Sequence, residues 1–408
     1  MDTLGAGMQA GGVNEPRLAR AAAAAGTGPD ATEAVEAALA QVRAGLGEAP
    51  ATLAVVFLGG GYAYCVDQVR DAVAEQLHPE VLVGVTAQGV IAGAAEIETD
   101  TSLSVWAAFL PGAVCTPLRY PAPASGVESA AVWPDVPGGA HGLVMLADPF
   151  TFPAEEFLGW VNHAHPGLPV SGGLASGSTR GGGNRLLLDR GIYGDGAVAV
   201  ALGGSVRLTP LVSQGCRPVG PSYVVTSSDR NLIAELGGKP AVERIHQVYA
   251  EADDADRRRM RAGLHIGLVI DEYADEHETG DFLVRGVLGA DPARGVVAVG
   301  DLVDVGQTVR LHVRDADSAD EDLRRLIAQL TPEPAPDAAL LFTCNGRGSQ
   351  LFGHPDHDAV LVHEALRGTP LAGFFAAGEF GPVGGRSHLH GFTASLLTIS
   401  TADDAGAS

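Results

Sequence analysis

Hydrophobic positions along the chain alternate between helical spacing and short apolar runs that end at glycine or proline. DATEAVEAALAQVRAGLG, residues 30–47, has Ala, Val and Leu at helical spacing, with Asp30 as N-cap and glycines at its end. Leu53–Leu58 has the pattern of a buried strand. VDQVRDAVAEQL at 66–77 predicts a second helix and VLVGVT at 81–86 a second buried strand.

Short apolar runs dominate the rest of the first half, and Gly or Pro turn signals separate several of them. The predicted strands are VIAGAAEI, SLSVWAAFL, GLVMLA, AVAVALG and SVRLTPLV. They favour mixed or antiparallel sheets. Residues 117–140 are rich in Pro, Gly and Ala, and they predict a surface excursion outside the core.

The second half repeats this mixture of helices and strands. Strands are predicted at SYVVT, LHIGLVI, DFLVRGVLG, GVVAVG, QTVRLHVRD, LLFTCNG and LAGFFAAG, with LHGFTASLLTI as the last. Helices are predicted at KPAVERIHQVYAE, at DAVLVHEAL and at SADEDLRRLIAQL, where Ser318 and Glu321 form a capping box. The expected fold class is mixed α/β, with two domains of mixed or antiparallel sheets flanked by helices.

Composition divides the chain into four parts. Residues 1–29 are rich in Gly and Ala without periodic apolar positions, which predicts a flexible leader. A boundary near 213–221 gives domains at 30–215 and 216–400, followed by a tail at 401–408.

Charge and cysteine content restrict the environment and the partners. The net charge of −23 opposes binding to a phosphate backbone, so nucleic acid is not an expected partner. The four cysteines show no paired close spacing of a zinc site or redox dithiol, which indicates a reducing compartment. No secretory signal and no apolar run of membrane-spanning length is visible, so we expect a cytoplasmic protein without membrane contact.

Candidate chemistry lies in Gly-rich segments at strand ends, where backbones approach ligands closely. GGLASGSTRGGGNR at 172–185 could form an anion nest, but it lacks the GK[ST] ending of a phosphate loop, and we favour a flexible loop. TCNGRGSQLFG at 343–353 brings Cys344, Asn345 and Arg347 together, and GEFGPVGGRSHLHGFT at 378–393 supplies Glu379, His388 and His390.

These residue types suit a zwitterionic ligand. Arg347 can hold a carboxylate bidentately, and Glu379 can accept hydrogen bonds from an ammonium group. The alternative is structural: Arg347 or Arg217 pairs with Glu379 inside the fold. A catalytic alternative makes Cys344 a nucleophile, His390 its base and Glu379 the orienting group of a thiol hydrolase. The His pairs 354/357 and 388/390 lack the companion ligands of a recognisable metal site, so no metal is expected.

Five ordered motifs in the second half resemble the FIST C-terminal domain. They are GCRPVGP (215–221), ELGGKPAVE (235–243), the stretch 282–315, FTCNGRGSQLFG (342–353) and GFFAAGEFGPVGGRSHLHGFTAS (373–395). VGVTAQGVIAGAAEIE (83–98) and GGLASG (172–177) are similar to the FIST N-terminal domain.

The resemblance implies a non-catalytic, ligand-sensing module of intracellular signal transduction that binds small molecules such as amino acids. The chain has no room for an output domain, so the expected signal passes to a partner protein in trans. The motif positions give the expected ligand-binding residues: Arg217, Asn345, Arg347, Glu379 and His390. No cofactor is expected. Because some family members are similar to haem-binding nitric oxide sensors, haem ligation by His390 or His388 stays open as an alternative.

Overall fold

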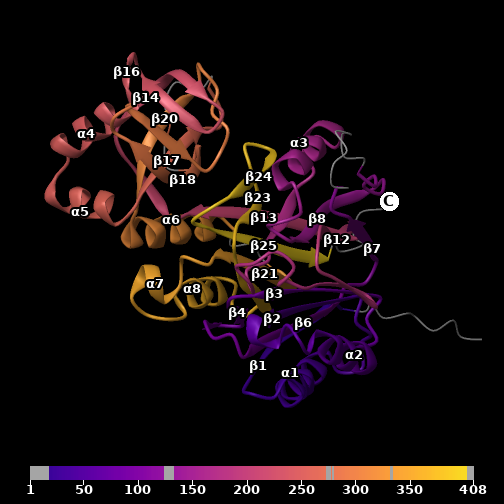
Figure 1. Cartoon of the computed structure of the whole chain (residues 1–408). Helices are drawn as coiled ribbons and strands as arrows, with labels where there is room; N and C mark the ends of the chain where they lie inside the picture. Colours follow the sequence, from indigo (N-terminus) through magenta and orange to yellow (C-terminus); the bar gives the residue numbers. More distant parts are fainter. Residues whose placement is uncertain (1–17, 124–132, 273–276, 278–279, 331–333, 402–408) are drawn as a thin grey trace, which may run out of the picture.

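The computed structural model describes residues 18–123, 133–272, 277, 280–330 and 334–401. It has a three-sheet body and a separate barrel (Figure 1). The predicted mixed α/β class is confirmed, because parallel and antiparallel strands share sheets with helices on their faces.

Three six-stranded sheets of the body share one strand order. In each sheet, an edge strand and its neighbour are antiparallel, two parallel strands follow, and a β-hairpin completes the sheet. The first sheet is β1 (Arg20–Thr27), β6 (Ser102–Phe109), β2 (Leu53–Gly59), β3 (Val81–Ala87), β10 (Leu186–Leu188) and β11 (Gly191–Tyr193). The second is β7 (Ala113–Tyr120), β12 (Ala197–Gly204), β8 (Ala140–Ala147), β9 (Val170–Leu174), β23 (Glu379–Val383) and β24 (Arg386–His390). The third is β13 (Val206–Gln214), β25 (Thr393–Thr401), β21 (Ala338–Cys344), β22 (Leu371–Ala376), β4 (Val90–Ala92) and β5 (Ala95–Ile97).

Each sheet corresponds to one unit of chain that exchanges its hairpin with another unit. A helix joins the two parallel strands of every unit: α2 (Val66–Leu77), α3 (Ala154–Ala164) and α8 (His357–Ala365). The hairpin that follows β3 pairs with β22, the hairpin that follows β22 pairs with β9, and the hairpin that follows β9 pairs with β3. The body is therefore a cyclic arrangement of three related units.

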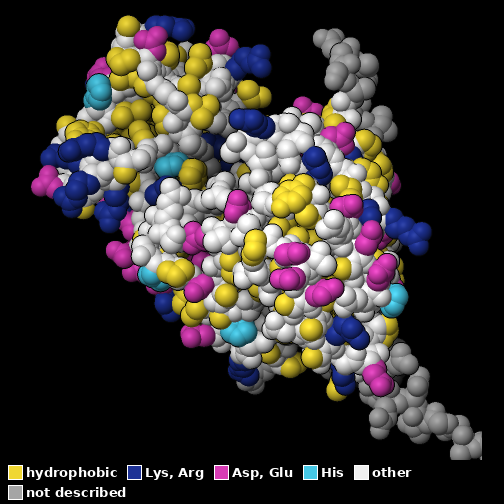
Figure 2. All heavy atoms as spheres, turned by 60° about the horizontal axis from the view of Figure 1, so that its bottom comes forward, with side chains coloured by type: hydrophobic (Ala, Val, Ile, Leu, Met, Phe, Trp, Pro, Cys, Tyr) yellow, Lys and Arg dark blue, Asp and Glu magenta, His cyan; other side chains and the backbone are white. Residues whose placement is uncertain are grey.

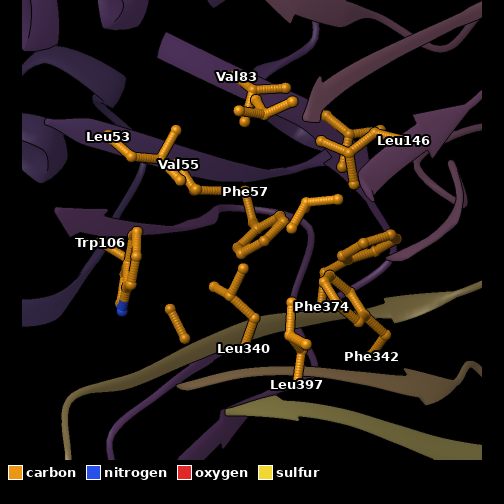
Figure 3. Close-up of a cluster of buried hydrophobic side chains, with 14 of the residues drawn as sticks. Leu53, Val55, Phe57, Val83, Trp106, Leu146, Leu340, Phe342, Phe374 and Leu397 are labelled. Atoms are coloured by element: carbon orange, nitrogen blue, oxygen red, sulfur yellow. The ribbon is translucent and has the colours of Figure 1, made fainter. Parts of the chain in front are cut away.

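The inner faces of the three sheets enclose the main core (Figure 3). Phe57 of β2 packs against Phe342 of β21 and Phe374 of β22, with ring centroids 6.3 and 5.1 Å apart. The outer faces are covered by helices: α1 (Ala31–Leu46) and α2 on the first sheet, α3 on the second, and α6 (Ala316–Gln329) with α8 on the third. Strands buried on both faces explain the continuous apolar runs in the sequence.

The barrel is inserted into the third unit, between β13 and α6. It consists of β14 (Cys216–Asp229), β15 (Leu232–Leu236), β16 (Lys239–Pro240), α4 (Ala241–Glu251), α5 (Asp254–Ala262), β17 (Leu264–Val269), β18 (Phe282–Asp291), β19 (Val296–Val299) and β20 (Thr308–Arg314). It closes because β14 pairs with both β20 and β15. The strand pairing does not follow the predicted division into domains at 30–215 and 216–400. Residues 338–401 return to the body, and their strands belong to its sheets.

Some local predictions were wrong. Residues 20–27 of the predicted leader form β1, in which buried small side chains alternate with half-buried ones beside β6; residues 1–17 and 402–408 lie outside the described residues. Residues 117–120 of the predicted excursion belong to β7.

Two further predictions, at the end of the chain and at α6, also differ from the structure. The last predicted strand is two strands, β24 and β25, with Phe392 at φ 65° in the turn between them. Helix α6 is capped by Asp315, not Ser318: the Asp315 carboxylate accepts from the Ser318 amide at 3.2 Å.

Acidic side chains are spread over the face of the body seen in Figure 2, whereas hydrophobic side chains gather on the barrel. Among the described residues, no helix combines the length and the apolar character that crossing a membrane requires.

Candidate functional site

Four of the five predicted ligand residues meet at one edge of the body. Because β21 and β22 are parallel, their carboxyl ends lie side by side, and the Asn345 amide donates to the Ala376 carbonyl at 2.8 Å. Arg347 lies in the turn after β21, and Glu379 begins β23 shortly after β22. His390 of β24 lies opposite Glu379 in the hairpin register. The structure thus brings Asn345, Arg347, Glu379 and His390 to the same edge of the body.

Arg347 is buried and paired with a residue that the sequence did not single out. Its Nε and Nη2 atoms donate to the two carboxylate oxygens of Asp358 on α8, at 2.6 and 2.8 Å. The two side chains are 1% and 0% exposed. Burial opposes ionisation of Asp358, but the Arg347 guanidinium and His357 hold the pKa of that carboxyl below its usual range. The ion pair of Arg347 is thus with Asp358, whereas the structural alternative had placed it with Glu379.

The ion pair continues outward to the surface. His357 Nδ1 lies 2.9 Å from an Asp358 oxygen, and His357 Nε2 lies 2.9 Å from an oxygen of Asp320 on α6. The Phe352 ring stacks on the His357 imidazole at 3.4 Å between centroids. These contacts tie the turn after β21 to helices α6 and α8.

Glu379 and Arg347 each keep one unmatched polar atom. Glu379 Oε2 accepts from the Thr393 hydroxyl at 2.8 Å and the Thr393 amide at 3.3 Å. Glu379 Oε1 and Arg347 Nη1 are buried and have no hydrogen-bond partner among the described residues. Burial raises the pKa of Glu379 to about 8, although the Thr393 hydrogen bonds and the Arg347 charge act in the opposite direction. We refer to Arg347, Asp358 and Glu379 as the buried centre.

The raised pKa of Glu379 makes a testable contribution to stability. A carboxyl with a pKa near 4.5 when unfolded and about 8 when folded takes up a proton on folding. The contribution of this proton uptake to the free energy of unfolding is therefore complete below about pH 4.5, and it is lost as pH rises toward 8. We expect Glu379→Gln, which keeps the shape and acceptor of the neutral acid, to gain stability relative to the wild type between pH 5 and pH 8 in urea unfolding.

The exposed Glu36→Gln on α1 is the matched control for the loss of one carboxyl group at the surface. If the difference in unfolding free energy between Glu379→Gln and the wild type stays constant from pH 5 to pH 8, this result would contradict the protonated state that burial assigns to Glu379.

The residues of the thiol hydrolase alternative are not poised for catalysis. Burial raises the pKa of Cys344 to about 12, so the reactive thiolate is disfavoured. Burial lowers the pKa of His390 to about 3, and its Nε2 atom lies 2.9 Å from the Gly381 carbonyl oxygen. Within the described ranges, no group of three or more His, Cys, Asp or Glu side chains could hold a metal ion.

The barrel joins the body through two adjacent connections that touch the buried centre. Cys216 of β14 lies opposite Arg314 of β20 in the strand register, and the Asp315 amide donates to the Gly215 carbonyl at 3.4 Å. We call Gly215–Cys216 and Arg314–Asp315 the hinge. A Cβ atom on Gly215 would lie 2.4 Å from the Phe392 carbonyl oxygen and 3.0 Å from Arg347 Nη1. Only glycine therefore fits where the hinge covers Arg347.

Arg217, the fifth predicted residue, lies apart from the other four, in a cleft between the barrel and α6. This cleft has a volume of about 600 Å³. It is lined by Arg217, Pro218, His277 and Arg310 from the barrel and by Ser318, Glu321, Asp322 and Arg325 from α6. Arg217 Nε donates to Asp315 at 2.7 Å, and its Nη2 atom contacts Asp256.

Sequence reasoning missed Asp358, Arg310 and Glu321. Asp358 lies on a predicted helix and Arg310 in a predicted strand, and no local pattern tells which distant element each will face. Glu321 was assigned to helix capping. The glycine-rich segment 172–185 also differs from a free loop, because Gly172 and Gly173 belong to β9 and the buried Asn184 binds Asp148 at 3.1 Å.

Comparisons with known proteins agree with the motifs. The FIST N domain model matches residues 52–239, and the FIST C domain model matches residues 241–382. An uncharacterized protein of Mycobacterium tuberculosis (strain H37Rv) is 42% identical over 376 residues, covering 91% of this chain and 97% of the relative. An uncharacterized protein of Mycobacterium bovis is 43% identical over 376 residues, covering 91% and 96%. The boundary between the two models falls inside the barrel, between β16 and α4.

Proposed function

Because this chain belongs to the FIST family, whose domains are sensory domains suggested to bind small ligands in signal transduction, we propose that it is a non-catalytic sensor of an amino acid or related small carboxylate. The ligand binds in the cleft between the barrel and α6. Its binding changes the position of the barrel on the hinge, and this change is passed to a partner protein in trans.

The observation that carries this proposal is the position of the cleft. It has about 600 Å³, charged side chains on both sides, and direct proximity to a two-strand connection. A ligand held by both sides binds the closed arrangement better than the open one, and it therefore shifts the equilibrium between them. Clefts between domains are common locations of small-molecule sites.

The five predicted residues take two roles in this proposal. Arg217 shapes the cleft, where its two aspartate partners fix its guanidinium. Arg347 lies against Gly215 of the hinge, and Asn345, Glu379 and His390 lie at the same edge of the body as Arg347, so the four residues respond to the position of the hinge. The unmatched atoms of Arg347 and Glu379 are costly in the closed state, and they gain water when the hinge lifts.

Exposed hydrophobic side chains on the barrel support a protein partner (Figure 2). Four large ones, between 46% and 69% exposed, belong to the barrel: Val224, Leu288, Leu302 and Val305. We propose that the protein acts in the cytoplasm, as its four free cysteines favour. Haem binding through His388 or His390 has no specific support in the geometry of these two residues.

The test is thermal unfolding of the full chain against amino acids, related carboxylates and hemin. A ligand that binds only the folded state adds about 2.7 kcal/mol at a concentration 100-fold above its Kd. We expect a saturable rise in Tm with an amino acid or carboxylate and none with its amide and ester analogues, which lack the carboxylate charge. A panel without any saturable shift, or a shift by hemin alone, would contradict the proposal.

A further inference from the structure

Most charges in the cleft between the barrel and α6 already have partners. Arg217 binds Asp315 and Asp256. Arg325 Nη2 donates to Asp322 at 2.7 Å, and the other oxygen of Asp322 accepts from the Ser213 hydroxyl and the Gln214 amide, each at 2.9 Å. These groups are committed to holding the hinge and the start of α6.

Arg310 differs from the other cations of the cleft. It lies on β20, and its Nε atom donates to the Gly220 carbonyl at 2.7 Å. No carboxylate among the described residues pairs with it, so both of its terminal nitrogens are left for another acceptor. Burial lowers the pKa of Arg310, because partial desolvation disfavours the charged guanidinium. Such a group gains most from an anion.

Glu321 is the complementary group on the other side. It lies on the exposed face of α6, and within the described part of the chain its carboxylate has no ion pair and no hydrogen bond. His277, which also lines the cleft, contacts the Asp271 carbonyl through Nε2 at 3.0 Å. Among the described residues that line the cleft, Arg310 and Glu321 are thus a positive and a negative side chain without an ion pair, on opposite sides of the cleft.

We propose that Arg310 binds the carboxylate and Glu321 the ammonium group of an α-amino acid, whose two charged ends bridge the barrel and the body. This assignment rests on the proposed sensor function and names the residues that select its ligand. Arg310 supplies two parallel N–H donors, which match the two oxygens of a carboxylate. Because the ligand bridges two bodies, both contacts form only when the cleft is closed.

The two residues predict different selectivities. The experiment measures by calorimetry the Kd of the amino acid that raises Tm, and the Kd of the same acid without its amino group. Arg310→Gln should weaken both ligands about 10- to 100-fold, because the contact with the shared carboxylate is lost. Glu321→Gln should weaken the amino acid about 10-fold and leave the des-amino acid within twofold of the wild type.

The control is Arg324→Gln, on α6 but lining the cavity on its other side, and it should bind both ligands like the wild type. Unliganded Tm checks the folding of every variant. If Arg310→Gln fails to fold, Arg310→Lys replaces it and should retain intermediate affinity for both ligands.

The outcomes separate the two levels of the proposal. A wild type that binds while Arg310→Gln and Glu321→Gln bind equally well overturns the assignment of these residues and leaves the sensor function standing. Loss of des-amino acid binding in Glu321→Gln also overturns it, because that contact would then not be with the ammonium group. A wild type that binds neither ligand class overturns both the assignment and the proposed function.

Discussion

Replacing Asp358 by Asn should cost about 3–5 kcal/mol of unfolding free energy, the largest loss expected for one polar substitution in this chain. The change removes the counterion of Arg347, which is 1% exposed and donates both of its charge-assisted hydrogen bonds to Asp358. Asparagine keeps the volume but leaves a buried guanidinium charge uncompensated. Urea unfolding of the full chain at neutral pH measures the loss.

The control for Asp358→Asn is an ion pair in solvent. Lys239 and Glu243 lie 3.1 Å apart with side chains 50% and 55% exposed, so Glu243→Gln should cost less than about 1 kcal/mol. The double variant Arg347→Met with Asp358→Leu removes both charges together and should recover much of the stability. A loss below about 1 kcal/mol for Asp358→Asn alone would show that Arg347 finds another partner, and the buried centre would then be incorrectly described.

The sequence predicted most elements of this fold because their signals are local. Helix α1 begins after Asp30, whose side chain accepts from the Thr32 amide at 2.8 Å, and it ends at Gly47. Helix α2 has the predicted bounds, Val66–Leu77. By contrast, β1 was missed because both its buried and its half-buried positions are alanines, so RAAAAAGT has no hydrophobic period of two.

The candidate site was predictable only in part, for a related reason. Motifs at strand ends contain Arg347, Glu379 and His390, and the structure brings these residues to one edge, since parallel strands bring their carboxyl ends together. Their partners come from elements that join this edge by hairpin exchange and helix packing. Asp358 on α8 and Gly173 on β9, which pairs with Glu379, are examples. Such contacts depend on the arrangement of the three units, and local sequence patterns do not predict that arrangement.

One glycine position shows that the three units obey the same packing constraint. In each parallel pair, a glycine of the second strand lies opposite a residue of the first: Gly84 opposite Val56, Gly172 opposite Met145, and Gly373 opposite Leu341. A Cβ atom at these glycines would lie 2.5, 1.9 and 1.7 Å from the carbonyl oxygen of the opposite residue. The same backbone approach thus recurs in units whose sequences differ.

Gly373→Ala and Gly172→Ala should therefore each cost about 3 kcal/mol or more, and Gly84→Ala should cost less. The added methyl group meets backbone atoms of a paired strand, which cannot move without breaking the sheet, and Gly172 has in addition a φ of +139°. Urea unfolding measures the three losses. Gly286→Ala in β18 is the control, because nothing lies within 4 Å of its Cβ position, and its effect should stay below about 1 kcal/mol. Small losses of unfolding free energy, equal at all four positions, would mean that the two strands of each parallel pair can move apart without destabilising the fold. The close backbone approach would then not be required for assembling the three units.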